Sequence, residues 1–143
     1  IFFGMSDENM DKVLAQPWVM IGSDGSLRAP EGPLSHDHPH PRSYGAHTRF
    51  LRAALDGRTV PLEEAVRKMT SLPADHFHLA GRGRIARGSA ADVAVFDPDA
   101  VRERTTYAGP HQLSEGLQAL VVNGRITVDG GRITGRRAGR FLD

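Results

Sequence analysis

The stretch Trp18-Val19-Met20-Ile21-Gly22-Ser23-Asp24-Gly25 decides the fold predicted for this chain. Its first five residues form a continuous apolar run, and its last three form a polar tip that is typical of a turn. A continuous apolar run is typical of a strand covered on both faces, as in a parallel sheet. Functional groups of α/β folds and barrels collect at the carboxyl ends of such strands. We therefore expect a buried strand that ends near Asp24.

A short helix is predicted immediately before this strand, over residues 6–16. Ser6 is a suitable N-cap, acidic residues follow it in the first turn, and Pro17 ends the helix. The apolar residues 1–4 have the pattern of the end of another strand. Strand end, helix and buried strand together make a βαβ step of an α/β domain. Because the chain opens inside a strand, we expect it to be a fragment of a longer protein.

The residues after Asp24 predict a long irregular loop and two helices. The loop covers residues 26–46 and is rich in proline, and loops of this length in compact domains are often functional. The helices are expected over residues 47–55 and 61–72, where apolar side chains recur with a helical period. Pro73 is expected to end the second helix.

The second half of the chain has the pattern of antiparallel β-structure. Strands are predicted over residues 93–96, 117–122 and 126–128. Asn123-Gly124 is a strong hairpin signal, because a type I′ turn needs positive φ at both central residues. Gly130-Gly131 predicts a second turn before a last short strand at residues 132–134. The pattern changes near residue 80 and divides the chain into an α/β part, residues 1–80, and a β part, residues 81–143.

Composition excludes several classes of function. The 143 residues contain 18 Lys and Arg against 17 Asp and Glu, a net charge of +1. This balance argues against nucleic acid as the main partner, and no apolar run approaches the roughly 20 residues of a membrane helix. Without cysteine the chain has no disulfide and no thiolate metal ligand. We expect a globular, cytoplasmic protein whose partner is a small molecule, with neither nucleic acid nor membrane.

Asp24 is the first candidate for chemistry. A carboxylate at the end of a buried strand can act as a general base or as a metal ligand. Ser-Asp-Gly is also ordinary turn chemistry, so the side chain could simply hold the turn. The spacing alone leaves both interpretations open.

The loop that follows offers His36, His38, His40, Arg42 and Tyr44. Three alternating imidazoles could bind zinc, but the prolines between and after them favour an extended loop that is solvated or faces a substrate. The arginine could hold a carboxylate through two hydrogen bonds. The alternative is a surface arginine paired with a nearby acid.

These residues together resemble the N-acyl-D-amino-acid deacylase (D-aminoacylase) family of the amidohydrolase superfamily. The resemblance lies in residues 17–25, in the Pro-His-Pro-Arg loop at residues 38–45, and in residues 62–74. Shorter motifs at residues 83–85, 91–93 and 122–124 are similar to the wider superfamily. The resemblance covers essentially the whole chain, which would be the C-terminal third of such an enzyme.

The resemblance implies an α/β plus β fold. Residues 1–80 would be the C-terminal part of a TIM-like metal-dependent hydrolase barrel, and residues 81–143 a small antiparallel β-sandwich domain. The implied reaction is hydrolysis of an N-acyl-D-amino acid to a carboxylate and a D-amino acid, with zinc as the cofactor. Asp24 would move a proton from zinc-bound water to the leaving amine and is also a tentative metal ligand. Arg42 would bind the substrate carboxylate, with His40 and Tyr44 orienting that contact.

In this family a His-x-His motif follows the first barrel strand, and the other metal ligands include a cysteine; neither that strand nor a cysteine occurs in this chain. The resemblance therefore implies that the main ligands and the remainder of the barrel lie in a missing N-terminal part. We expect the chain alone to be inactive and to bind zinc weakly. Two other interpretations stay open. One is another amidohydrolase, such as a hydantoinase or dihydroorotase relative, and the other is a non-catalytic binding module built on the β domain.

Overall fold

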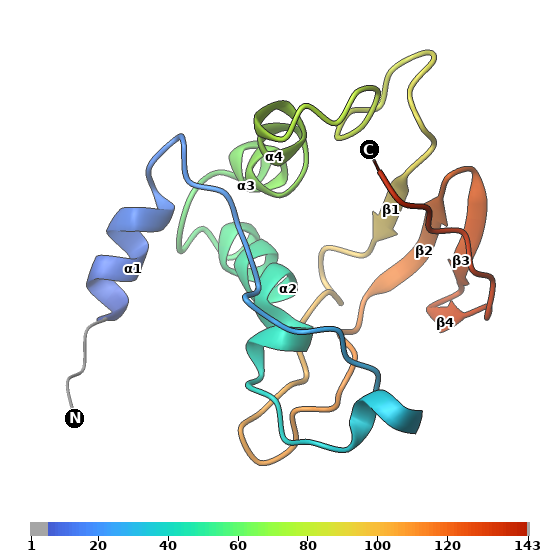
Figure 1. The fold of residues 1–143 in the computed structure, drawn as a ribbon. Helices are drawn as coiled ribbons and strands as arrows, with labels where there is room; N and C mark the ends of the chain where they lie inside the picture. The colour runs from blue at the N-terminus through green and yellow to red at the C-terminus, as the bar shows by residue number, and fades with distance from the viewer. Residues whose placement is uncertain (1–5, 143) are drawn as a thin grey trace.

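The computed structural model describes residues 6–142, which form a helical part followed by an antiparallel sheet (Figure 1). The predicted strand end at residues 1–4 lies outside the described residues. The helices are α1 (Asp7–Leu14), the 3₁₀ helix η1 (Gly32–Ser35), α2 (Arg42–Leu55), α3 (Leu62–Met69) and α4 (Ser71–His76). The strands are β1 (Val93–Phe96), β2 (Leu117–Val122), β3 (Arg125–Asp129) and β4 (Arg132–Ile133).

Helix α1 confirms the helix predicted before Pro17. Ser6 is the N-cap, and its hydroxyl accepts the N–H of Asn9 at 3.2 Å. Glu8 and Lys12 form an i,i+4 ion pair on the exposed surface at 2.6 Å.

The segment after α1 corrects the predicted buried strand. Residues 19–26 have no regular secondary structure and pair with no strand of the described chain, and Trp18 is 70% exposed. The N–H of Ile21 faces the carbonyl of Lys68 at 3.5 Å, so this segment contacts α3 and not a sheet. A strand needs hydrogen-bonding neighbours on its edges. Among the described residues the apolar run packs against helices and pairs with no strand, so the prediction of a strand was wrong for this structure.

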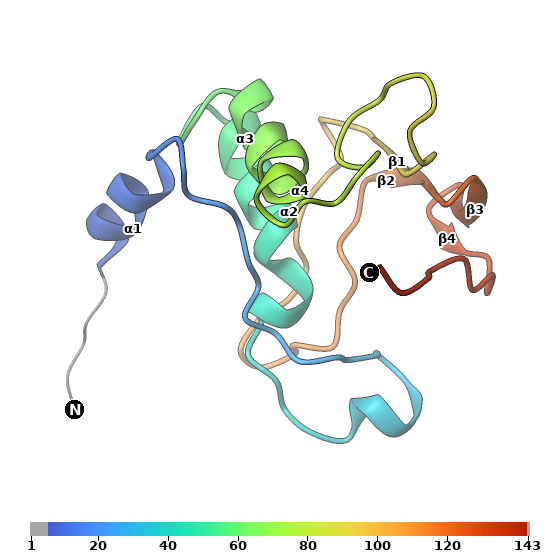
Figure 2. The same ribbon diagram turned by 45° about the horizontal axis from the view of Figure 1, so that its top comes forward.

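The helical core lies where α2 and α3 meet. Phe50 and Ala54 of α2 pack with Val60 and Ala65 into a buried cluster, and partly buried residues from the flanking segments close it. Those flanking residues are Leu14, Ile21 and Met69. Figures 1 and 2 both show α2, α3 and α4 gathered on one side of the sheet.

Two helix boundaries differ from the prediction. Helix α2 begins at Arg42 and not at residue 47, and Pro41 precedes it with φ −50°. Proline suits this position because its φ is already helical and its missing N–H would have had no partner in the helix. The helix predicted over residues 61–72 breaks at Thr70, whose φ is −131°, and Pro73 lies inside α4 and does not end a helix.

The sheet confirms the predicted hairpins. Its four strands follow one another antiparallel in the order β1-β2-β3-β4. Asn123 and Gly124 have φ of 48° and 76°, as the two-residue turn between β2 and β3 requires. The strands form one sheet, and the division of the chain at residue 80 into a barrel part and a sandwich part stays a prediction.

The connection between β1 and β2 returns to the helical part. It runs beside α2 and reaches the loop that contains η1, as Figures 1 and 2 show. The guanidinium of Arg52 in α2 donates to the carbonyl of Pro98 at 2.5 Å. Within residues 6–142, no helix has the length and apolar character needed to cross a membrane.

Candidate functional site

Asp24 occupies an exposed turn in front of the first turn of α2. Its φ is 47°, a left-handed conformation that aspartate adopts more readily than most residues. The hydroxyl of Ser23 accepts the N–H of Gly25 at 3.2 Å and closes the turn. The side chain of Asp24 is 85% exposed, so its carboxylate is open to a ligand or to water.

The glycine after Asp24 allows this turn to approach α2 closely. A Cβ atom on Gly25 would lie 2.9 Å from the Cα of Ser43, closer than side-chain carbons come to backbone atoms. The close approach brings the loop that carries Asp24 against the first turn of α2, where Arg42 begins the helix.

Arg42 and Asp24 form an ion pair. The Nη2 of Arg42 donates to the Oδ2 of Asp24 at 2.6 Å, and both side chains are largely exposed. The pair also places the carboxylate near the positive end of the α2 dipole. An exposed pair of this kind adds little to the free energy of folding. The structure therefore brings two predicted site residues into contact, and this contact contributes little to stability.

His40 contacts both Arg42 and a residue from the second half of the chain. Its Nδ1 receives the backbone N–H of Arg42 at 3.1 Å, and its Nε2 lies 3.0 Å from the hydroxyl of Tyr107. The rings of His40 and Tyr107 meet edge to face with centroids 5.1 Å apart. His38 approaches the same residue, with its Nε2 2.6 Å from the carbonyl oxygen of Tyr107.

Tyr44 makes a second pair of the same kind. Its hydroxyl lies 3.1 Å from the Nδ1 of His111, and the two rings also meet edge to face. The Nε2 of His111 lies 2.6 Å from the carbonyl oxygen of Asp37, whose carboxylate pairs with Arg28. Two tyrosine–histidine pairs thus join residues 37–44 to residues 107–111. His36 is exposed beside this network.

The segment that leads to Asp24 is held from α3. Lys68 is fully buried, and its Nζ donates to the carbonyls of Gln16 and Val19, the latter at 3.1 Å. Burial lowers the pKa of Lys68, and the neighbouring Glu64 partly opposes this effect. The neighbouring Arg67 donates to the carbonyl of Pro17. Basic side chains of α3 therefore satisfy backbone acceptors between α1 and the Asp24 turn.

Comparison with known proteins shows the family to which this chain belongs. The model of the amidohydrolase family matches residues 10–128. The chain belongs to the amidohydrolase family. It is 43% identical over 126 residues to an N-acyl-D-glutamate deacylase of Alcaligenes xylosoxydans xylosoxydans, a match that covers 87% of this chain and 24% of that protein.

Two crystal structures of amidohydrolases resemble this amidohydrolase chain closely. A D-aminoacylase that defines a novel subset of amidohydrolases superposes with a TM-score of 0.86 at 39% identity, covering 97% of this chain and 28% of that one. An N-acyl-D-glutamate deacylase from Bordetella bronchiseptica, complexed with zinc and a phosphonate inhibitor, superposes with a TM-score of 0.80 at 38% identity, covering 96% and 28%. This amidohydrolase chain spans about a quarter of the length of these relatives.

Zinc does not fit a site made from the described residues of this amidohydrolase chain alone. In the part of the chain that the structure describes, no group of three or more His, Asp or Glu side chains could hold a metal ion. Both nitrogens of His40 and the Nε2 of His38 face protein partners, so the alternating imidazoles do not form the zinc site that their spacing allowed. Asp24 could contribute one carboxylate to a metal site but not the full set of ligands.

A hollow among the described residues of this amidohydrolase chain lies away from the Asp24 turn. It measures about 450 Å³ and is lined by the end of α4 and residues 78–89. Arg84 donates two hydrogen bonds to Asp75 there, at 2.7 and 2.6 Å, and these bonds hold the pKa of Asp75 below its usual value. Because both charged groups already pair with each other and none of the predicted site residues lines the hollow, we place the site at the Asp24 turn.

The sequence did not single out Tyr107, and for His111 it indicated only a structural role with no named partner. Both lie in the irregular connection between β1 and β2, where no periodic pattern assigns a side chain to a face. Their partners are 67 positions away in the sequence, and neither carries a local motif. Nothing in a single sequence pairs them with His40 and Tyr44.

Proposed function

We propose that this chain is the C-terminal part of a metal-dependent amidohydrolase that converts N-acyl-D-amino acids to a carboxylate and a D-amino acid. The contact between Asp24 and Arg42 carries the proposal. It puts a carboxylate that can move a proton beside a guanidinium that can bind the carboxylate of the substrate. The similarity to N-acyl-D-glutamate deacylases supports this substrate class.

The same proposal includes the architecture of the whole enzyme. Residues 1–80 would complete a TIM-like barrel, and residues 81–143 would form part of a small β-sandwich domain. The apolar run at residues 18–22 would then gain strand neighbours from the upstream part of the barrel. The zinc of the Bordetella bronchiseptica relative supports zinc as the cofactor, with its main ligands supplied by that upstream part. A cytoplasmic location stays a prediction.

Asp24 would act as general base and then as general acid. It takes a proton from the attacking water while the water oxygen bonds to the amide carbonyl carbon. The tetrahedral intermediate then collapses, the carbon–nitrogen bond breaks, and Asp24 returns the proton to the leaving nitrogen. The exposed position of the carboxylate allows access to both partners of this transfer.

Arg42 would bind the α-carboxylate of the substrate. A guanidinium presents several N–H donors in one plane and matches a carboxylate in two hydrogen bonds. The ion pair with Asp24 uses the Nη2 of Arg42. Arg42 can therefore hold the substrate beside the group that moves the proton, while His40 and Tyr44 keep the start of α2 in place.

A substrate panel tests the proposal. The complete, zinc-loaded protein that contains this chain should release amine from N-acetyl-D-glutamate and N-acetyl-D-leucine and much less from their L enantiomers. Opening of hydantoin or dihydroorotate rings in place of amide hydrolysis would favour the alternative amidohydrolase. No hydrolysis of any of these compounds would favour the binding module.

A further inference from the structure

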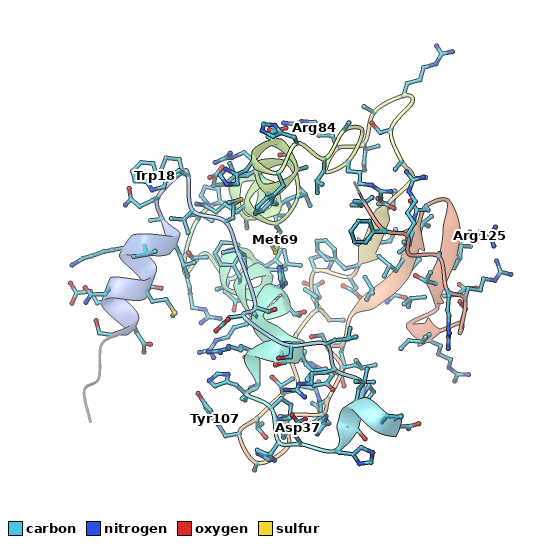
Figure 3. The ribbon with its side chains drawn as sticks, in the orientation of Figure 1. Trp18, Asp37, Met69, Arg84, Tyr107 and Arg125 are labelled. Atoms are coloured by element: carbon cyan, nitrogen blue, oxygen red, sulfur yellow. The ribbon has the colours of Figure 1, made fainter. Side chains whose placement is uncertain are left out.

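The second half of the chain contributes side chains to the start of α2 that the proposed reaction does not use. Tyr107 is the foremost of these, because it contacts the loop through both its hydroxyl and its carbonyl oxygen. Figure 3 shows Tyr107 at the same end of the molecule as Asp37, beyond the first turn of α2.

The partners of His40 decide which nitrogen of the neutral ring carries the hydrogen. A backbone N–H can only donate, so the Nδ1 that receives the N–H of Arg42 carries a lone pair. The proton of the neutral ring is then on Nε2, which donates to the hydroxyl oxygen of Tyr107. The N–H of Arg42 thus fixes the tautomer of His40, and the hydroxyl of Tyr107 accepts from Nε2 and holds the ring in this orientation.

This hydrogen bond matters because Arg42 is the first residue of α2. The first N–H groups of a helix have no acceptor within the helix and need a capping group. Pro41 occupies the N-cap position, and its side chain makes no capping hydrogen bond. The imidazole of His40 supplies the acceptor instead and fixes the backbone from which the Arg42 side chain reaches Asp24.

We propose that Tyr107 is a positioning residue for Arg42 and acts through His40. The inference rests on the proposed function, in which Arg42 binds the carboxylate of an N-acyl-D-amino acid. Tyr107 is held in place by His38, which donates to its carbonyl oxygen. The neighbouring bonds of His111 to Asp37 and Tyr44 anchor the same segment. A residue of the second half thereby sets the specificity for acids.

The test replaces Tyr107 by Phe in the complete protein and keeps the ring while removing the acceptor. KM for an N-acyl-D-amino acid should rise about 2- to 10-fold, the range that one hydrogen bond usually contributes. KM for the corresponding C-terminal amide should stay within 2-fold, since no carboxylate meets Arg42. Leu113→Ala, an exposed change in the same connection, is the matched control and should leave both values unchanged.

Variants of His40 separate positioning from a general structural role. His40→Ala removes the acceptor for the Arg42 N–H and should raise KM for the acid to a similar degree. His40→Asn should restore most of the loss, because an asparagine oxygen is a good acceptor at the start of a helix. In either background Tyr107→Phe should add no further change. If Tyr107→Phe alone fails to fold, the comparison of His40→Ala with His40→Asn still tests whether the acceptor at His40 positions Arg42.

Several outcomes overturn the inference. One is an unchanged KM for the acid in Tyr107→Phe, and another is equal damage to acid and amide. A third is a full additional effect of Tyr107→Phe in the His40→Ala background, which would show that the tyrosine does not act through the histidine. If the wild-type protein hydrolyses no N-acyl-D-amino acid, the proposed function itself fails and this inference falls with it.

Discussion

At the residue scale, the site depends on a carboxylate and a guanidinium that lie 18 positions apart in the sequence and meet at 2.6 Å. The sequence nominated both side chains, Asp24 for proton transfer and Arg42 for a carboxylate. It left open whether the arginine would instead pair with a nearby acid. The structure shows that Arg42 does pair with an acid and that this acid is Asp24. The ion pair and the proposed binding of a substrate carboxylate therefore use the same arginine at the same place.

Replacing Asp24 by Asn tests the proton-transfer role in the complete protein. The amide keeps the shape of the side chain but cannot take a proton, so kcat should fall about 10²- to 10⁴-fold, the usual contribution of general acid–base catalysis. Zinc content, measured by elemental analysis, should change little if upstream residues supply most ligands. Glu31→Gln, an exposed change on the same loop, is the control. Wild-type turnover of Asp24→Asn would reduce Asp24 to a turn residue.

Replacing Arg42 by Lys tests carboxylate binding. Lysine keeps the positive charge near Asp24 but loses the two-point geometry of the guanidinium. We expect KM for N-acyl-D-amino acids to rise, with a smaller gap between the acids and their C-terminal amides. Steady-state kinetics on matched acid and amide pairs measures this gap. Equal loss on both substrates would mean that Arg42 only stabilises the loop.

At the element scale, α3 organises the approach to the site. Lys68 and Arg67 donate to backbone carbonyls of residues 16–19, and Glu64 lies beside both basic groups. Hydrogen bonds from Arg67 are the main reason that the pKa of Glu64 lies below its usual value of 4.5. The helix therefore presents a cluster of charged groups, and its contribution to stability depends on pH because Glu64 must be ionised to pair with Arg67.

This cluster predicts a pH-dependent stability difference between wild type and Glu64→Gln. A carboxyl whose pKa is lowered by folding binds fewer protons in the folded state than in the unfolded state near that pH. Its stabilisation is complete above its usual value of 4.5 and is lost as the pH falls through the lowered pKa. The difference in Tm should therefore be present at pH 7 and shrink below about pH 4.5.

Glu63→Gln is the matched control for this experiment, because Glu63 is exposed and adjacent on the same helix. Its Tm should differ little from that of the wild type across the same pH range. A Glu64→Gln difference that stays constant from pH 7 to pH 3 would contradict a stabilising role of the Glu64–Arg67 pair.

Elements with local signals could be predicted, and elements that depend on distant partners could not. The N-cap at Ser6 and the turn at Asn123-Gly124 are short-range features, and both appear where the sequence placed them. The run at residues 18–22 has strand composition, but strand pairing depends on neighbours that the described residues do not supply. The start of α2 was missed because Pro41 can end a loop or begin a helix.

At the scale of the whole molecule, the connection between β1 and β2 borders the helical part along much of α2. Arg52 reaches the carbonyl of Pro98, and Arg49 faces Glu103 at 3.8 Å. The tyrosine–histidine pairs then extend the contact to the loop before α2. The site therefore draws on both halves of the chain, although Asp24 and Arg42 come from the first half alone.

The purified 143-residue chain should hydrolyse no N-acyl-D-amino acid and should bind zinc weakly. Its described residues form no cluster that could hold a metal ion, and Asp24 is mostly exposed. Calorimetric titration with zinc and an amine-release assay at high protein concentration measure the two properties. The complete protein is the positive control, and zinc-dependent turnover by the isolated chain would contradict the expectation.

The hydrogen bonds between residues 37–44 and 107–111 should also hold the two halves of the chain together after the backbone between them is cleaved. Residues 85–88 are exposed, and the side chain of Ile85 is open to solvent over most of its surface. A protease that nicks the backbone there severs the covalent link but leaves the hydrogen bonds around Tyr107 and His111 intact. The two pieces should co-elute from a sizing column as a split protein. The same position would then suit an engineered break, with each piece produced separately and reassembled by mixing.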